Sequence, residues 1–562
     1  MTIANTLIGH LVDVSESGMV AVLVDDEQGR APTITIGDED ILVGQIGSYV
    51  MIRQGDLKIL AFVTRMIEQE KLPTVSSQAT TTDVRLPYAQ RIINLIPLGT
   101  VSSEIFERGV SSFPTTGAEV HAIGSKDIDL IFSKFSSKGF EVGFLSSNSD
   151  SKVYLDPTPL FGRHFAILGQ TGAGKSWTVA TLVQRTIAIM PKAHIVILDL
   201  HGEYCWKDKS GKNCSAFDDA IVRYVDAREL EIPYWLMTYG ELCDMLIDRT
   251  EQSAHNQTAV FREALNELKT KEGVALKLPR ATLDTPIYFD LKELRAKIES
   301  KNGMVPNAKG DGLKQGTLTG AFDNFLMRLD SRTNDIRYDF LLNPKKRNAS
   351  DTLSPMLRDF VGLGDPKRPV TVIDLSSVPF DVRPTVAAQI GRLAFEFNYW
   401  NPMYRDFPLL LICEEAHAYI PRESSSQYEG SRKSMERIAK EGRKYGVGLA
   451  VVSQRPHEVS ETVLSQCGTF ICLRITNPSD QAYVASLVPE SERGLVDILA
   501  GLGRGEAMAL GEAVPLPTRF FFHKPKPNPN SDDIDFFLKW KEGPDDIDVD
   551  DIVNRWRKQE RN

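Results

Sequence analysis

The segment that most constrains this chain is Gly169-Gln-Thr-Gly-Ala-Gly-Lys-Ser176, which matches the pattern Gly-x-x-x-x-Gly-Lys-Ser in full. It follows a short apolar run, Phe165–Leu168, and precedes a stretch with helical periodicity at 176–190. Glycines in such a loop let backbone N–H groups surround phosphates, and the start of the helix adds the positive end of its dipole. A chance glycine-rich turn is the alternative. The complete pattern between a strand and a helix favours a phosphate-binding loop.

Apolar runs recur along the chain and predict a buried parallel sheet, because they alternate with helical stretches. They lie at Ala193–Leu200, Val370–Leu375, Pro408–Cys413, Gly448–Ser453 and Thr469–Arg474. The predicted fold is therefore the α/β core of a P-loop NTPase. Between 206 and 365 helical periodicity takes over, with the clearest pieces at 241–248, 257–271, 291–300 and 320–330. We interpret this region as a mostly helical insertion.

The N-terminal region predicts a small antiparallel β-barrel, because short β-branched or apolar runs alternate with turn residues. These runs lie at 11–14, 19–24, 33–36, 48–53 and 60–63, and more follow a polar stretch (74–83) at 91–97 and 119–122. We place the barrel at 1–150, the P-loop core at 151–205 and 366–522, the helical insertion at 206–365 and an acidic tail at 523–562.

A pair of acidic residues, Glu414 and Glu415, follows the apolar run that ends at Cys413. Carboxylates at the end of a buried strand are costly unless a cation meets them, and Mg²⁺ bound to a phosphate is such a cation. We expect Glu414 and Ser176 to hold Mg²⁺ and Glu415 to orient and deprotonate the attacking water. Solvated carboxylates at a strand end are the alternative.

Two more side chains are candidates for contact with the phosphates. Lys175 is expected to reach the β- and γ-phosphates of ATP. Gln454 follows the strand run Gly448–Ser453, where an amide can sense the γ-phosphate or the water. An ordinary amide at a strand end is the other interpretation of Gln454. ATP and Mg²⁺ are the predicted cofactors.

Composition limits the partners and the compartment. The net charge of −10 argues against a surface that binds nucleic acid broadly, although a local basic channel is compatible with it. No run of eighteen apolar residues and no N-terminal secretory pattern occur, so we expect a cytoplasmic protein without membrane spans. The six cysteines lack Cys-x-x-Cys spacing, which favours buried thiols over a zinc site.

Several motifs occur in an order that resembles the HerA family. They are Gly169–Ser176, Asp199-Leu-His-Gly-Glu-Tyr204, Glu414-Glu-Ala-His417, Glu441-Gly-Arg-Lys-Tyr-Gly446, Ser453-Gln-Arg-Pro456, Leu464-Ser-Gln-Cys467 and Arg474-Ile-Thr-Asn-Pro-Ser-Asp480. The resemblance covers roughly 160–520 and is to bacterial members. It implies a RecA/FtsK-like core, a homo-hexamer with ATP between subunits, and duplex DNA in a central pore.

The resemblance also implies roles for individual residues. ATP contacts are expected along Gly172, Ala173, Gly174, Lys175, Ser176 and Trp177, with weaker candidates for base or ribose contact at Leu516 and Pro517. Arg163 and Arg443 match positions of ATP-contacting arginines, and arginines from a neighbouring subunit would stabilise transition-state charge. A surface arginine or an ion-pair arginine is the alternative for each. Asp199 and Glu203 would position water or metal, or Asp199–Tyr204 is a structural turn built on Gly202.

Two functions remain open. The first is an ATP-driven double-stranded DNA translocase or helicase that works with a partner effector, a nuclease or a sirtuin-like NADase, in repair or in anti-phage defence. The second is an ATP-regulated scaffold that assembles and activates such an effector with little translocation of its own. In both, we expect the effector to dock on the N-terminal barrel, because the barrel carries no catalytic motif.

Overall fold

The computed structural model describes most of the chain and divides it into two compact units. One unit contains residues 1–191 and 449–529, and the other contains residues 192–448 and 530–562. The described residues are 6–15, 18–24, 33–36, 39–71, 88–102, 105–207, 212–302, 304–306, 313–316, 318–423, 429–544 and 546–558. The predicted polar stretch at 74–83 lies outside them.

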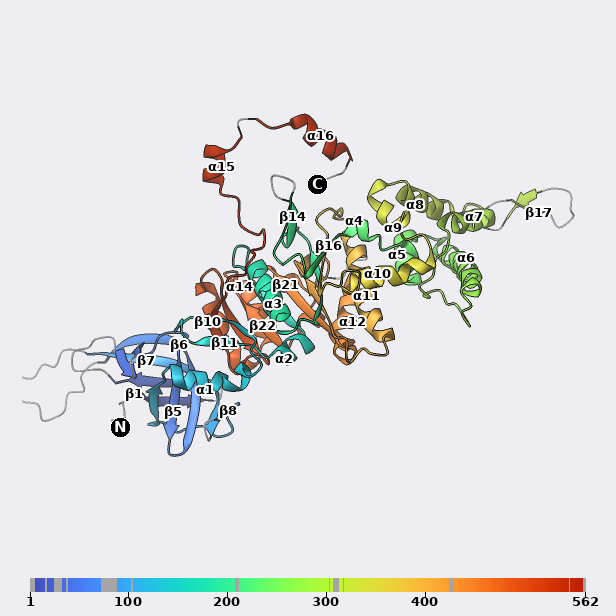
Figure 1. The fold of residues 1–562 in the computed structure, drawn as a ribbon. Helices are drawn as coiled ribbons and strands as arrows, with labels where there is room; N and C mark the ends of the chain where they lie inside the picture. Colours follow the sequence, from blue (N-terminus) through green and yellow to red (C-terminus); the bar gives the residue numbers. More distant parts are fainter. Residues whose placement is uncertain are drawn as a thin grey trace, which may run out of the picture. The chain divides into compact units, whose positions relative to one another are not determined.

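The N-terminal part of the first unit is a closed antiparallel barrel, coloured in blues in Figure 1. Its strand order is β2-β1-β9-β5-β6-β7, and pairing between β2 and β7 closes the wall. Alternate side chains point inward and form the core, as period-two patterning requires. The predicted barrel is thereby confirmed. Its strands are β1 (Leu7–Ser15), β2 (Gly18–Leu23), β5 (Tyr49–Gln54), β6 (Leu57–Lys71), β7 (Tyr88–Ser102) and β9 (Glu119–Ala122), with β8 (Ile105–Arg108) paired to β7 and a separate hairpin of β3 (Thr33–Ile36) and β4 (Glu39–Leu42).

The rest of the first unit places the phosphate-loop strand β12 (Phe165–Leu168) between two parallel neighbours, β21 (Val447–Ser453) and β22 (Thr469–Cys472). Leu168 pairs with both Ser453 and Cys472, so the three strands end at one edge. Beyond β22 the strand order continues through β23 (Glu506–Gly511), β24 (Thr518–Phe522), β10 (Glu141–Leu145) and β11 (Lys152–Tyr154). The helices of this part are α1 (Ser125–Ser136), α2 (Pro157–Gly162), α3 (Lys175–Ile189), α13 (Glu461–Leu464) and α14 (Pro478–Leu487), with 3-10 helices η6 (Pro456–Glu458) and η7 (Glu490–Gly501).

The second unit contains four parallel strands in the order β20-β13-β19-β16. They are β20 (Leu409–Cys413), β13 (His194–Asp199), β19 (Val370–Asp374) and β16 (Val222–Asp226). The buried apolar strands β13, β19 and β20 were predicted, and with the P-loop strand they confirm the predicted NTPase core. Strand β16 was not predicted, because it lies at the end of the strand order and only one of its residues is fully buried.

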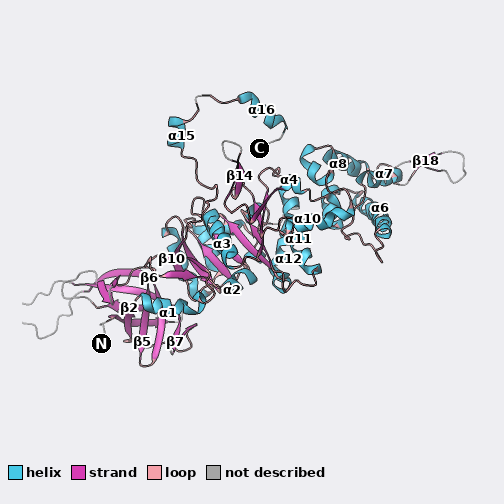
Figure 2. Cartoon of the chain, in the orientation of Figure 1, coloured by secondary structure: helices cyan, strands magenta, loops and turns pink. Residues whose placement is uncertain are grey.

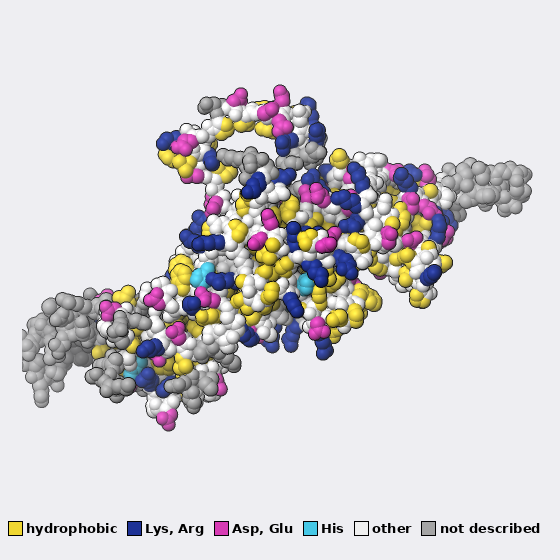
Figure 3. Space-filling model, in the orientation of Figure 1, with side chains coloured by type: hydrophobic (Ala, Val, Ile, Leu, Met, Phe, Trp, Pro, Cys, Tyr) yellow, Lys and Arg dark blue, Asp and Glu magenta, His cyan; other side chains and the backbone are white. Residues whose placement is uncertain are grey.

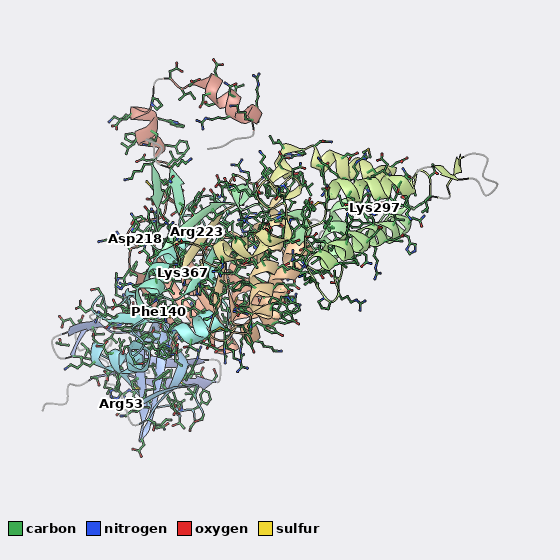
Figure 4. All side chains as sticks on the ribbon, turned by 45° about the vertical axis from the view of Figure 1, so that its right-hand side comes forward. Arg53, Phe140, Asp218, Arg223, Lys297 and Lys367 are labelled. Carbon is green, nitrogen blue, oxygen red and sulfur yellow. The ribbon has the colours of Figure 1, made fainter. Side chains whose placement is uncertain are left out.

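Helices make up most of the remainder of the second unit (Figure 2). Helices α6 and α7 lie side by side, and Lys297 of α7, labelled in Figure 4, pairs with Glu267 of α6 at 2.7 Å. The helices are α4 (Ala227–Leu230), α5 (Tyr239–Leu246), α6 (Ala254–Ala275), α7 (Leu291–Lys301), α8 (Asp323–Thr333), α9 (Asp339–Leu342), α10 (Leu353–Phe360), α11 (Arg383–Trp400), α12 (Glu429–Glu441), α15 (Phe536–Glu542) and α16 (Val549–Lys558). Short pieces complete it: η1 (Tyr234–Leu236), η2 (Ile336–Tyr338), η3 (Ser350–Thr352), η4 (Ala416–Ala418), η5 (Gly442–Tyr445), and the hairpins β14 (Cys205–Lys207) with β15 (Asn213–Ser215) and β17 (Met304–Pro306) with β18 (Leu313–Gln315).

Within the described ranges, no helix combines the length and the apolar character that crossing a membrane requires.

Candidate functional site

The loop between β12 and α3 has the backbone conformation of a phosphate cradle. Gly172 and Gly174 have φ values of 75° and 109°, which side chains other than glycine rarely adopt. Gly174 is the residue before α3, and the helix begins at Lys175. The loop N–H groups and the helix start therefore meet at one place, as an anionic phosphate requires. This geometry fits the triphosphate of ATP.

Lys175 lies at the start of α3 and is almost fully buried, with 8% of its surface exposed. Its Nζ lies 3.4 Å from the carbonyl oxygen of Gln170, inside the loop. The loop is fixed from a second side, because the Gly505 N–H donates to the Ala173 carbonyl at 3.1 Å. Ser176 and Trp177 follow on the first turn of α3 and are half-buried. The predicted phosphate-binding residues thus form one continuous loop and helix start.

Gln454 follows the end of β21 and reaches this loop. The Thr171 hydroxyl donates to the Gln454 side-chain oxygen. The structure therefore brings the predicted sensor to the phosphate loop, and its sensing role stays a prediction. A second contact was missed by sequence reasoning: the Gln170 N–H donates to the Arg474 carbonyl at 2.9 Å, and the Gln170 side chain lies 2.6 Å from the Thr476 hydroxyl.

The second unit carries carboxylates at the carboxyl ends of all four of its parallel strands. Asp199 of β13 pairs in register with Asp374 of β19, which also pairs with Asp226 of β16. Glu414 directly follows Cys413, the partner of Leu198. These acids therefore share one edge of the sheet. Only Asp199 and Glu414 were predicted, because register is not visible in a single sequence.

Glu414 is a buried carboxyl group with one strong hydrogen-bond donor. It is 5% exposed, and the Tyr204 hydroxyl donates to its Oε1. Burial raises the pKa of Glu414 well above its ordinary value, which the hydrogen bond from Tyr204 only partly offsets. A divalent cation would favour the ionised form, so this carboxyl fits the predicted Mg²⁺ ligand. Tyr204 was part of a quoted motif, but its role was not predicted.

Glu415 adopts a left-handed backbone conformation with φ 45°, which is uncommon for a residue other than glycine. It is 9% exposed, and its Oε2 lies 3.3 Å from His417 Nδ1. Glu415 is thus the residue at which the chain leaves the strand direction and enters the 3-10 helix η4. The catalytic role of Glu415 stays a prediction.

Asp199 holds the turn that follows β13. Its Oδ1 accepts from the backbone N–H groups of residues 201, 202 and 203 at 3.2, 2.8 and 3.1 Å, and its Oδ2 accepts from Tyr204 N–H at 3.0 Å. Gly202 has φ 74° in this turn. Burial raises the pKa of Asp199 to about 7, and the N–H groups of Tyr204 and Glu203 oppose this shift. These bonds support the interpretation that Asp199 stabilises a structural turn. They also hold the backbone of Tyr204, whose hydroxyl donates to Glu414.

Arg163 and the segment 512–517 lie at the edge of the sheet opposite to the phosphate loop. Arg163 precedes β12, whereas the loop follows it, and the four-residue strand between them spans about 13 Å. The Arg163 carbonyl accepts from Gly468 N–H at 2.9 Å, and its guanidinium pairs with Glu512. Arg163 is thus held away from the loop of its own chain.

Leu516 and Pro517 lie at the same edge as Arg163. Leu516 is fully buried, and the Pro517 carbonyl accepts from the Tyr49 hydroxyl of the barrel at 2.7 Å. Within one chain these two residues do not line the phosphate loop. Their contact with ATP stays a prediction.

Arg443, in the second unit, also lies at the strand edge opposite to the predicted catalytic residues. It lies in η5, and Gly446 at the end of that turn accepts from Leu409 N–H, at the start of β20, at 2.8 Å. Glu414 and Glu415 follow the other end of β20. Arg443 is exposed on the edge opposite to the paired acids of its own chain. Both candidate arginines thus lie at strand edges opposite to the phosphate loop or the paired acids of their own chain.

Comparison with known proteins gives a consistent result. The family described as the central domain of the helicase HerA matches residues 140–394. The DNA double-strand break repair helicase HerA of Sulfolobus acidocaldarius is 28% identical over 450 residues, which are 79% of this chain and 80% of that protein. The HerA of Pyrococcus furiosus is 29% identical over 466 residues, 77% of each chain. The chain is thus similar to the HerA helicases over most of its length.

The similarity to the HerA helicases and the phosphate loop together support an ATP-hydrolysing enzyme. Both named relatives are archaeal, and the predicted bacterial origin stays a prediction. Among solved structures, VirB4 of Thermoanaerobacter pseudethanolicus is similar, with a TM-score of 0.44 and 16% identity, over 68% of this chain and 96% of that one.

Proposed function

We propose that this chain is a member of the HerA family and an ATP-driven double-stranded DNA translocase that works as a homo-hexameric ring. The observation that carries the proposal is the position of its candidate arginines. Arg163 and Arg443 lie at the strand edges opposite to the phosphate loop and the paired acids, respectively. A complete ATP site would therefore need an arginine from the next copy, as ring ATPases arrange it.

Each residue has a role in this proposal. The loop N–H groups and Lys175 bind the triphosphate, and Ser176 and Glu414 hold Mg²⁺, which neutralises phosphate charge when bound. Glu415 takes the proton of the attacking water, and His417 at 3.3 Å orients the Glu415 carboxylate. Gln454 senses the terminal phosphate through its place beside Thr171. The neighbour's Arg443 stabilises the charge that develops in the transition state.

Support for DNA as the substrate comes from the relatives, which are named DNA double-strand break repair helicases. We propose that duplex DNA passes through the centre of the ring. We also propose that an effector enzyme, a nuclease or a sirtuin-like NADase, docks on the barrel, in DNA repair or in anti-phage defence.

The test measures ATP hydrolysis of the full chain with and without linear duplex DNA, together with displacement of a third strand annealed to that duplex. Translocation predicts stimulation of hydrolysis by the duplex and ATP-dependent displacement of the third strand. A rate of ATP hydrolysis that is unchanged by duplex DNA but rises when the product of a neighbouring gene is added would instead support the scaffold function.

A further inference from the structure

Residues 474–480 lead from β22 into α14 and contact two loops of the candidate site within the first unit. Strand β22 is parallel to β12, so these residues leave the sheet at the same edge as the phosphate loop. Asn477 caps α14, because its side-chain oxygen accepts from the Ser479 N–H at 2.9 Å, and Pro478 lies in the first turn of that helix. We call residues 474–480 the bridge segment.

The first half of the bridge segment holds the phosphate loop through Gln170. The Gln170 N–H donates to the Arg474 carbonyl at 2.9 Å. In the amide orientation that satisfies both of its ends, the Gln170 side-chain nitrogen donates to the Thr476 hydroxyl at 2.6 Å, and its oxygen accepts from Arg474 Nε at 3.0 Å. The Gln170 carbonyl in turn lies 3.4 Å from Lys175 Nζ. The bridge segment therefore reaches the lysine of the phosphate loop through one intervening residue.

The second half of the bridge segment holds the sensor loop, which we define as residues 454–457 after β21. Asp480 Oδ1 lies 2.6 Å from His457 Nδ1, and it also accepts from the His457 backbone N–H at 3.3 Å. At the other end of the sensor loop, the Gln454 side-chain oxygen accepts from the Thr171 hydroxyl of the phosphate loop. Asp480 therefore fixes one end of the loop whose other end presents Gln454.

Burial distinguishes the pair of Asp480 and His457 from the ion pairs on the surface. On the face drawn in Figure 3, Lys and Arg side chains lie among Asp and Glu side chains, and exposed pairs of that kind contribute little to stability. Asp480 is 5% exposed, whereas the His457 side chain is 37% exposed. An acid in the first turn of a helix is often favourable for the helix dipole alone, but Asp480 also accepts from a second element. A buried carboxylate needs its donors, so this contact constrains the sensor loop.

We propose that Asp480 is a positioning residue, which acts through His457 to hold Gln454 beside the phosphate loop. Because the same bridge segment also holds Gln170, it ties the position of the sensor to that of the phosphate loop, and hydrolysis depends on such positioning. The proposal rests on the proposed function, since it explains how the sensor of that site is held. A pair that only stabilises the fold is the competing interpretation.

The first test compares steady-state ATP hydrolysis by the full chain and by its His457→Ala variant, with duplex DNA present. The variant is expected to lose at least about fivefold in kcat while KM for ATP stays within about twofold, because the loop N–H groups and Lys175 still bind the triphosphate. His457→Asn is expected to recover most of the loss, since its side-chain N–H can donate to Asp480 in place of Nδ1. Equal kcat in the wild type and His457→Ala, or no recovery in His457→Asn, would overturn the proposal.

His523→Ala is the matched control. The His523 side chain also pairs with a carboxylate, that of Glu141 at 2.8 Å, and it is 30% exposed, close to the 37% of His457. This variant is expected to keep the wild-type kcat, and thermal unfolding of both variants measures what the loss of a histidine–carboxylate pair does to stability. An equal fall of kcat in His523→Ala and His457→Ala would show a general effect of destabilisation and would contradict the positioning role.

A double-mutant cycle separates this proposal from the proposed function. Gln454→Ala is expected to lower kcat at least as much as His457→Ala does, and the double variant should lose no more than Gln454→Ala alone, because both changes remove one function. Losses that multiply would show that His457 acts independently of Gln454 and would overturn the proposal. Full activity in Gln454→Ala would contradict the sensor in the proposed function. A loss in Gln454→Ala together with full activity in His457→Ala would contradict the positioning role and leave the sensor in place.

Discussion

Glu414 and Glu415 are adjacent in the sequence but lie in different surroundings. Glu414 accepts a hydrogen bond from Tyr204 inside the protein, whereas Glu415 lies in a left-handed turn beside His417. Burial raises the pKa of Glu414 well above its ordinary value, and a bound cation would favour its ionised form. Two carboxyls in different surroundings are suited to different work, one to metal and one to the proton.

Replacement of Glu415 by Gln is expected to lower the rate of ATP hydrolysis by at least about 100-fold, since a general base is removed. Nucleotide binding should persist, because the phosphate loop is unchanged. The measurements are steady-state phosphate release and titration with a fluorescent ATP analogue. Glu414→Gln is the comparison: it should raise the Mg²⁺ concentration needed for half-maximal hydrolysis. Full activity in Glu415→Gln would disprove the assignment of the base.

Replacement of Lys175 by Ala is expected to weaken ATP binding by about 100-fold, the value of a charge-assisted hydrogen bond to phosphate. Lys175 is buried at the loop, and its ammonium group faces the Gln170 carbonyl oxygen inside the loop. We therefore expect that no surface side chain can take over its contact with the phosphates. Calorimetric titration with ATP measures the change. Unaltered affinity would show that the nucleotide binds elsewhere.

At the scale of elements, the turn into α3 depends on a backbone conformation that only glycine adopts easily. Gly174 has φ 109°, and a Cβ there would lie 3.5 Å from Gly505. Gly162, at the end of α2, has nothing within 4 Å of an added Cβ. The two glycines precede and follow the same short strand, and they form a matched pair for substitution.

Gly174→Ala is expected to reduce ATP affinity about tenfold, because a left-handed conformation costs about 1–2 kcal/mol for a residue with a Cβ. Gly162→Ala should bind ATP as the wild type does. The same titration measures both variants. Equal affinity in both would mean that the loop does not need its left-handed turn.

A second element-scale feature joins the barrel to the core of the first unit. Arg108 of β8 pairs with Glu492 of η7 and donates to the Gly511 carbonyl at 2.6 Å. Glu492 is 4% exposed, and its Oε2 has no hydrogen-bond partner among the described residues. The Arg108 guanidinium is therefore the one charged group that compensates this buried carboxyl within the described part of the chain.

Arg108→Ala is expected to destabilise the barrel by about 2 kcal/mol, since it leaves a buried carboxyl without a donor. Thermal unfolding and limited proteolysis measure the change. Adding Glu492→Leu to this variant should recover part of the loss, because the unpaired group is then gone. Arg53→Ala removes an exposed barrel arginine, labelled in Figure 4, and should change little. Greater damage in the double variant would contradict the role of the pair.

At the scale of the whole molecule, the thiols are distributed between interior and surface. Cys205, Cys243, Cys413, Cys467 and Cys472 are buried, and Cys214 is half-buried. Burial raises the pKa of Cys413, Cys467 and Cys472 to about 12. Thiolates, which react with maleimides, are therefore rare at these positions.

The native chain at pH 7 is expected to take up about one maleimide quickly, at Cys214, and the rest only after unfolding. Intact-mass spectrometry against time measures the labelling. The Cys214→Ser variant should lose the fast label. Rapid labelling at several positions of the folded chain would contradict the buried placement of the other thiols.

Sequence reasoning was most successful where the signal is local. The loop at 169–176 and the runs that became β12, β13, β19 and β20 are continuous patterns, and the structure confirms them. Strands β10, β11, β23 and β24 were not predicted as part of the sheet. Strand β10 joins the sheet through β24, where Gly143 pairs with Phe522, and no local pattern contains that pairing. The hydrogen bond from Tyr204 to Glu414 and the edge on which Arg163 lies depend on register and topology, which no local pattern contains.

The pairing of β2 with β7 has a consequence for how the barrel can be recognised. Along the described residues of the six strands that close the wall, backbone N–H and C=O groups bond to neighbouring strands, so a peptide cannot add to these six strands as an extra strand. A protein that binds this wall must recognise its outward-facing side chains and its loops. Its specificity would then change through point substitutions on the outer face, while the fold beneath stays the same.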